Sequence, residues 1–241
     1  MREFTFAISY ERGVDPLMDQ FIEHPELAAD SMDVPLGPDA FCRIERFSGP
    51  RSPLDTVERL RTDPAYDGAS VGESDCDVTA DHHVLERAPE RRVLYSYVEG
   101  IAGCTSVHAL AERYLDRGAL FETRREGDRH EWRVLLRSDR KVGLFYDALT
   151  GGLREGLSFH TGHLRDAETW NHGPLARAEL PGEQRVALRA AFRRGYYETP
   201  REISLEELAA ELDVPRSTLS YRLRRAEAEL VGSYDGAAFP E

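Results

Sequence analysis

The segment that most constrains this chain is residues 180–232, where helical patterns follow one another near the C-terminal end. Ser204 and Glu207 form a capping box, in which each side chain bonds the other residue's backbone amide at the start of a helix. Asp213 to Pro215 ends that helix, and Pro215 suits the first turn of the next helix because it has no N–H to leave unpaired. Two helices joined by so short a turn predict a helix-turn-helix, a layout that reads DNA.

The last of these helices has an apolar face and a polar face. At about 100° per residue, its apolar side chains fall within about 40° of one another and are expected to be buried; they are Leu219, Leu223, Ala226 and Leu230. The opposite face predicts contacts to base edges in a major groove, made by Ser217, Thr218, Tyr221, Arg224 and Arg225. Contacts to DNA phosphates are expected from Arg201, Arg216 and Arg222.

This segment resembles the DNA-binding domain of haloarchaeal transcription regulators of the bacterio-opsin activator type. The residues that carry the resemblance agree in order and spacing; they are Leu180, Gln184, Ala187, Leu188, Gly195, Tyr196, Tyr197, Pro200, Arg201, Leu205–Ala209, Ser217–Ser220 and Leu223–Glu227. The resemblance implies a transcription regulator whose third helix reads double-stranded DNA.

The composition also favours a protein of a halophilic archaeon. The net charge is −13, and among 31 basic residues only Lys141 is a lysine. An acidic, lysine-poor surface suits a cytoplasm of multimolar salt, so a halophilic archaeon is expected. No apolar run approaches the roughly 18 residues that a membrane span needs, and no signal peptide precedes the first strand. The chain is therefore expected to be cytoplasmic, with no membrane partner.

The charge is partitioned along the chain. Residues 1–179 hold 22 basic and 33 acidic residues, whereas residues 180–232 hold nine arginines and nine carboxylates. In about 1 M salt the Debye length is only roughly 3 Å, and counterion release adds little to binding. Binding to DNA is therefore expected to depend on close base contacts and dimerisation, and to respond weakly to salt.

The first 170 residues predict an α+β domain. Strand-like segments are expected at residues 3–9, 41–44, 84–87, 92–98, 119–124, 130–137 and 156–163. Helices are expected at 14–22, 54–60, 105–115 and 139–149, the second of them capped by Ser52 or Asp55. This order predicts ferredoxin-like antiparallel sheet units with helices packed on one face, followed by a C-terminal all-α helix-turn-helix domain. The expected boundaries are a regulatory or interaction domain at 1–170, a linker at 171–179 after a hinge near Trp170, the DNA-binding domain at 180–232 and a flexible tail at 233–241.

The N-terminal part also resembles the domain that accompanies this helix-turn-helix in haloarchaeal regulators, where it often follows a GAF sensor. The strand end at Tyr97–Gly100 and the corner at Leu115–Ala119 carry this looser match. Because Phe4 already lies in the first strand, no GAF or PAS segment is expected before it. The resemblance implies no catalytic activity, and a one-component regulator or one that takes its signal from a partner is expected.

Chemistry-bearing side chains are scattered. Cys42, Cys76 and Cys104 show no CxxC spacing and are expected to be ordinary small apolar or surface residues in a reducing cytoplasm, with Cys104 at a helix start as the better redox candidate. Cys76 with His82 and His83 matches no established metal spacing, so an acidic surface loop is favoured over a metal site. His160 and His163 are three apart on a strand, which predicts opposite faces. No catalytic residues, metal site or cofactor are therefore assigned.

Three interpretations remain open at this point. In the first, a regulator binds DNA as a homodimer, and its N-terminal domain dimerises, senses a small-molecule effector or contacts a protein partner. In the second, the N-terminal domain is a small α+β enzyme and the helices are a structural appendage. In the third, the helix-turn-helix binds proteins of the basal transcription machinery. The sequence favours the first.

Overall fold

The computed structural model describes residues 1–64, 66, 68, 70–73, 77–167 and 180–238. The chain divides into two compact units, Met1–Ala176 and Arg177–Glu241. The hinge near Trp170 and the linker at 171–179 lie outside the described residues.

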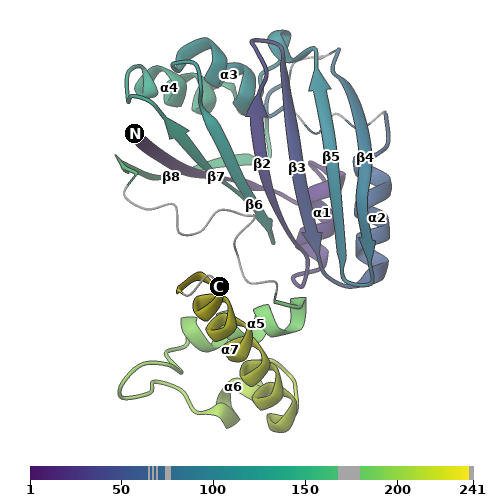
Figure 1. The fold of residues 1–241 in the computed structure, drawn as a ribbon, viewed down its shortest axis with the longest axis vertical. Coiled ribbons are helices and arrows are strands. Elements are labelled where there is room, and N and C mark those ends of the chain that lie inside the picture. Colours follow the sequence, from purple (N-terminus) through teal and green to yellow (C-terminus); the bar gives the residue numbers. More distant parts are fainter. Residues whose placement is uncertain (65, 67, 69, 74–76, 168–179, 239–241) are drawn as a thin grey trace. The chain divides into compact units, whose positions relative to one another are not determined.

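The N-terminal unit is built on one antiparallel sheet (Figure 1) whose eight strands lie in the order β4-β5-β3-β2-β6-β7-β1-β8. Their bounds are β1 Arg2–Tyr10, β2 Ala28–Pro35, β3 Ala40–Ser48, β4 Thr79–Ala88, β5 Arg91–Glu99, β6 Leu120–Glu126, β7 Arg129–Leu136 and β8 Leu157–Asp166. Its helices are α1 Pro16–Glu23, α2 Arg51–Arg61, α3 Val107–Tyr114 and α4 Val142–Gly152, with a single 3-10 turn η1 at Ile101–Gly103.

A single hydrophobic core joins all four helices to one face of the sheet. Phe4, Phe6 and Ile8 point to this face from alternate positions of β1, as their spacing predicts. Each helix contributes buried apolar side chains, among them Phe21 from α1, Leu54 from α2, Leu110 from α3 and Phe145 from α4. The predicted α+β class, with an antiparallel sheet and helices on one face, is confirmed.

The strand order consists of two ferredoxin-like halves that exchange their first strands. A β-α-β-β-α-β unit of this kind orders its strands 4-1-3-2. The half β4-β5-β3-β2 has β5 in the first-strand position, and the half β8-β1-β7-β6 has β1 there. The helix α1 follows β1 but packs with α2, and α3 follows β5 but packs with α4. The chain therefore crosses between the halves after β1 and again after β5.

Strand β2 is the main element that the sequence patterns did not predict. Its residues include Asp30, Ser31 and Asp33, which break the apolar alternation typical of a strand. The segment forms a strand nevertheless, because β2 lies between β3 and β6 and its backbone pairs with both. The predicted cap of α2 is also wrong, since Pro50 occupies the N-cap position and no side chain bonds there.

The C-terminal unit consists of α5 Gly182–Arg193, α6 Leu205–Glu211 and α7 Arg216–Ala238. Helices α5 and α6 both pack on α7 around a small core of their own. The buried members of this core are Ala187, Ala191, Ile203, Leu208, Ala209, Leu219 and Leu223. The predicted all-α unit at this end of the chain is therefore present.

Candidate nucleic-acid interface

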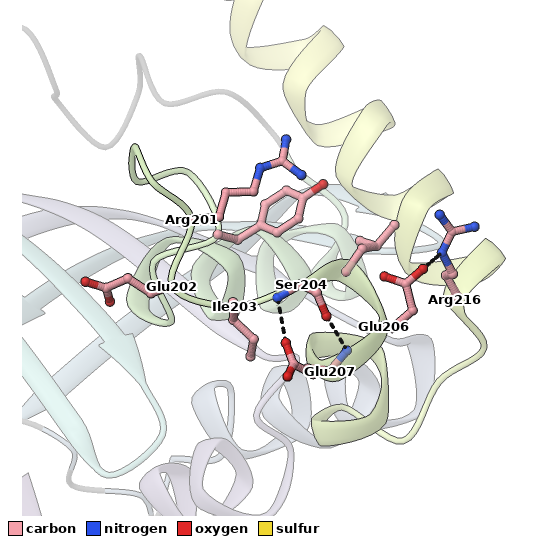
Figure 2. Close-up of a pocket in the computed structure, with 9 residues that line it drawn as sticks. Arg201, Glu202, Ile203, Ser204, Glu206, Glu207 and Arg216 are labelled. Atoms are coloured by element: carbon pink, nitrogen blue, oxygen red, sulfur yellow. Dashed lines mark hydrogen bonds and ion pairs between the residues drawn. The ribbon is translucent and has the colours of Figure 1, made fainter.

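The start of α6 is fixed by the predicted capping box. Ser204 Oγ accepts a hydrogen bond from the Glu207 amide at 3.2 Å, and Glu207 Oε2 accepts one from the Ser204 amide at 2.9 Å (Figure 2). These two bonds satisfy amides that have no partner within the helix. They lower the pKa of Glu207, because the backbone and side chain of Ser204 bond the charged carboxylate.

A tight turn connects α6 to α7. Asp213 adopts a left-handed backbone with φ of 51°, and the Val214 amide bonds the Ala209 carbonyl at 3.1 Å. Pro215 precedes α7, and its carbonyl accepts from the Leu219 amide at 3.0 Å. The proline therefore lies one residue before the helix, and α7 begins at Arg216.

The buried face of α7 agrees with the predicted stripe except at its far end. Leu219, Leu223 and Ala226 are 0%, 3% and 0% exposed. Leu230 is 43% exposed, so the prediction of its burial is wrong. The physical reason is length: α7 has 23 residues, against 12 in α5 and 7 in α6. The partner helices therefore do not cover it that far along.

The opposite side of α7 carries the residues predicted to contact bases. We call Ser217, Thr218, Tyr221, Arg224 and Arg225 the recognition surface. Tyr221 is 63% exposed, Ser217 and both arginines are exposed, and Thr218 is half-buried. Within the described part of the chain, neither Arg224 nor Arg225 forms an ion pair. Both guanidinium groups are thus available to an external acceptor.

Two of the three predicted phosphate contacts line one shallow hollow of about 490 Å³ beside the start of α6. The Arg201 guanidinium lies over the ring of Tyr196, 4.5 Å from its centre. Figure 2 shows Arg201 on one side of the hollow. Arg216 is on the other side, where its Nε bonds Glu206 Oε1 at 2.5 Å. Because Glu202, Glu206 and Glu207 also line the hollow, its arginines are outnumbered by carboxylates.

The third predicted phosphate contact lies elsewhere. Arg222 is not among the residues that line the hollow. Its Nη2 is 2.6 Å from Glu183 Oε2 at the start of α5, and its side chain is 23% exposed. The structure therefore brings Arg201 and Arg216 together and leaves Arg222 apart.

Sequence reasoning missed a contact that ties the loop after α5 to α7. The Tyr197 hydroxyl donates to Glu227 Oε1 at 2.6 Å, across 30 residues of sequence. Burial and this bond raise the pKa of Tyr197. Gly195, two residues earlier, has φ of 70°, a backbone that favours glycine. The glycine followed by two tyrosines is the feature that marked this corner in the sequence.

The cysteines and histidines of the N-terminal unit only partly match expectation. Cys42 is a free thiol, whereas Cys104 is buried and takes part in a disulfide, so the expectation of an ordinary residue in a reducing cytoplasm is wrong for Cys104. Cys76 lies outside the described residues. His82 bonds Ser96 at 2.7 Å and His83 bonds Asp81 at 3.2 Å. No group of three or more potential metal ligands occurs among the residues that the structure describes.

His160 and His163 lie on the same face of the sheet, contrary to the prediction. The β1–β8 register shifts between Phe4 and Phe6, so an extra residue in β8 restores the parity of the two histidines. His160 bonds Ser9 at 2.8 Å, and His163 bonds Thr5 at 3.1 Å and Glu3 at 2.9 Å. Glu3, Thr5 and Ser9 alternate with the core residues of β1, so both histidines lie on the sheet face away from the helices.

Comparison with known proteins assigns both units to families. A family model named HVO_2928_N and described as an N-terminal domain matches residues 3–170. A second, described as an HTH DNA binding domain, matches residues 180–232. No solved structure matches the chain. No helix among the described residues is both long enough and apolar enough to cross a bilayer.

The curated relatives are haloarchaeal regulators that match over short stretches. The transcriptional regulator NarO of Haloferax volcanii is 44% identical over 55 residues, which are 23% of this chain and 26% of that protein. A dimethyl sulfoxide reductase transcriptional activator of Halobacterium salinarum is 36% identical over 69 residues, 29% of this chain and 31% of that protein. The chain thus spans less than a third of the length of each of these relatives.

Proposed function

Because the chain belongs to the HVO_2928_N family and carries a helix-turn-helix domain of the bacterio-opsin activator type, we propose that it is a sequence-specific, DNA-binding transcription regulator. The observation that carries the proposal is the recognition surface. Its two arginines have no intramolecular ion pair among the described residues, and they lie on the helix face opposite the buried Leu219 and Leu223. Such a face is what a recognition helix needs in a major groove.

In this proposal the N-terminal residues of α7 enter the groove. Arg224 and Arg225 reach guanine edges, where a bidentate guanidinium is the commonest specific contact. Ser217, Thr218 and Tyr221 contact neighbouring bases. Arg201 and Arg216, at the hollow beside α6, hold phosphates, and Arg222 does so once it leaves Glu183.

We further propose that the protein acts as a homodimer on a two-fold site in the cytoplasm. Two-fold dimers are the common way for a small helix-turn-helix to gain affinity, and their half-sites then lie about one helical turn apart. The N-terminal unit would supply the dimer contact, sense an effector or contact another protein. The haloarchaeal origin of the relatives fits the acidic composition.

The test compares Arg224→Ala with Arg201→Ala in the full chain, on a duplex selected from a random library and on unselected duplex. Loss of Arg224 should cost about 1–3 kcal/mol on the selected site, or about 5- to 150-fold in affinity, and little on random DNA. Loss of Arg201 should weaken both DNAs similarly. Arg193→Ala, an exposed arginine at the end of α5, is the matched control. Equal losses on both DNAs for both variants would remove the assignment of roles.

Two alternatives make a different prediction in the same assay. An enzyme with a structural helical tail, or a helix-turn-helix that contacts only basal transcription proteins, would not shift any duplex at micromolar concentrations of the protein. The DNA-binding family of residues 180–232 favours the regulator.

A further inference from the structure

The N-terminal unit contains a layer of charged and polar side chains inside its core, between the sheet and the helices. We call it the buried polar layer; it consists of Asp33, Arg43, Glu45, Arg61, His108, Arg125, His130 and Trp132. All are at most 5% exposed. Register places the strand members on the helix-covered face, because His130 pairs with the core residue Ile8 and Arg125 pairs with His130. Arg61 and His108 reach the layer from α2 and α3.

One end of the layer is satisfied internally. Asp33 accepts from Arg43 Nε at 2.8 Å and Nη2 at 2.6 Å, from His108 Nε2 at 2.8 Å and from Ser31 Oγ at 2.9 Å. Burial acts to raise the pKa of Asp33, but the charge and bonds of Arg43 and His108 outweigh it and lower the pKa. This carboxylate therefore stays ionised and has its acceptor capacity filled.

The other end has too few acceptors. Glu45 is shared by two arginines, Arg61 through Nε at 2.8 Å and Arg125 through Nη1. The layer thus holds three guanidinium groups against two carboxylates. Asp15, a further buried carboxylate, already accepts from the amides of Leu17 and Met18 and from Tyr66. Within the layer the guanidinium groups therefore outnumber the carboxylates by one, and Asp15 supplies a further buried negative charge whose oxygens already accept hydrogen bonds.

Three nitrogen atoms in the layer have no hydrogen-bond partner in the structure: Arg61 Nη2, His130 Nε2 and Trp132 Nε1. A buried donor without an acceptor costs about 1–3 kcal/mol, and more when it is charged. Native proteins retain few such groups, and each calls for an explanation. Here the arginine and tryptophan can only donate, so the missing partner must be an acceptor.

The surroundings of these atoms favour an acceptor that carries negative charge. Burial and the nearby Arg125 and Arg43 lower the pKa of His130 well below its ordinary value. The His130 and Trp132 rings lie 4.5 Å apart, and His108 lies 5.4 Å from Trp132 and stacks on Phe41 at 4.0 Å. Positive charge with a wall of flat rings suits a small anion that has an apolar body.

We propose that the buried polar layer binds a small organic anion, carrying a carboxylate or phosphate group, that accepts hydrogen bonds from Arg61, His130 and Trp132. The role of this anion as an effector rests on the regulatory function proposed above. The layer lies where the two exchanged halves of the sheet meet, since Ser31 of β2 pairs with Thr123 of β6 and bonds it at 2.9 Å. An anion bound there contacts both halves at once.

The test follows thermal melting of the full chain through the emission of Trp132, in a Trp170→Phe background that removes the other tryptophan. The probes are the potassium salts of acetate, succinate and phosphate, exchanged against KCl at constant potassium concentration. A ligand that binds only the folded state raises the melting temperature in a saturable way. At least one probe should do so, and Arg61→Met should weaken its binding at least about 10-fold.

Arg61→Met also separates binding from folding. In this variant Glu45 still pairs with Arg125, and the guanidinium that is removed had a nitrogen without a partner. The melting temperature without any probe should therefore be equal to that of the parent or higher. His130→Phe is a second variant that keeps a ring and removes the donor. Arg129→Met, exposed on the same strand as His130, should leave the probe response unchanged.

No rise with any of the three probes, or an undiminished rise in both Arg61→Met and His130→Phe, overturns the proposal and leaves ordered water as the occupant. DNA binding is measured by anisotropy on the same samples. DNA binding without an anion response refutes this inference alone, whereas an anion response in a protein that binds no DNA refutes the proposed function and leaves the anion site.

Discussion

Removing one carboxylate next to the recognition surface should strengthen DNA binding. Glu206 holds Arg216 at 2.5 Å in the hollow beside α6, where the two side chains are 62% and 65% exposed. A phosphate can take Arg216 only by displacing Glu206, and the carboxylate also repels the phosphate. The change Glu206→Gln removes both obstacles and preserves the size of the side chain.

The magnitude follows from exposure. An ion pair this open to water contributes about 0.2–1 kcal/mol, which corresponds to about 1.4- to 5-fold in affinity. Salt does not abolish the attraction between Glu206 and Arg216, because the Debye length in 1 M salt, about 3 Å, exceeds the distance between the two charged groups. The gain should be equal on selected and random DNA, because phosphates carry no sequence information.

The assay is fluorescence anisotropy of labelled duplex at several KCl concentrations. Glu211→Gln is the matched control, since Glu211 is on the same helix but pairs with Arg194 of the α5 end. The variant should bind both DNAs more tightly than wild type, and by about the same factor. An unchanged affinity, or an equal gain from Glu211→Gln, would refute the phosphate role of Arg216.

Four further outcomes are expected. Asp33→Asn should lower the free energy of unfolding of the N-terminal unit by about 3 kcal/mol, because it leaves Arg43 buried without its counter-charge. Urea unfolding followed by Trp132 emission measures this loss. The double variant that also carries Arg43→Met should recover part of it. Burial raises the pKa of Glu3, but hydrogen bonds from His163 and Arg133 outweigh it and lower that pKa to about 2. The stability that Glu3 gives is therefore complete above its ordinary pKa of about 4.3 and is lost as the pH falls toward about 2, so the difference in melting temperature between wild type and Glu3→Gln should shrink over that range. Ser204→Ala should destabilise the C-terminal unit by about 1 kcal/mol, seen in its helical circular dichroism on melting. Wild-type affinity should change little between 0.5 and 3 M KCl, and a steep loss would contradict the dominance of base contacts.

The C-terminal unit could be predicted from sequence because its determinants are local. Ser204 and Glu207 are three residues apart, and Leu219 and Leu223 are one helical turn apart. The wrong prediction in this unit also has a physical cause. Leu230 continues the stripe of α7, but burial depends on the length of α5 and α6, which the pattern of α7 does not contain.

The buried polar layer could not be predicted because its contacts are non-local. Asp33 and His108 are 75 residues apart, and Glu45 and Arg125 are 80 apart. In an acidic chain, each of these side chains is indistinguishable in the sequence from a solvated surface charge. Asp33, together with Asp30 and Ser31, also prevented a search for apolar alternation from finding β2. The strand missed by sequence reasoning thus carries one of the two carboxylates of the layer.

The exchange of first strands links the two halves of the sheet on either side of the buried polar layer. Neither half of the sheet is complete by itself, because β5 supplies a strand to the half that contains β2, and β1 supplies one to the half that contains β6. The helices that follow these strands cross in the opposite sense, α1 to one half and α3 to the other. A change at the buried polar layer, which takes Arg61 from α2 and His108 from α3, therefore cannot be confined to one half. Because the halves exchange strands, we expect an anion bound at the layer to change the stability of both halves together.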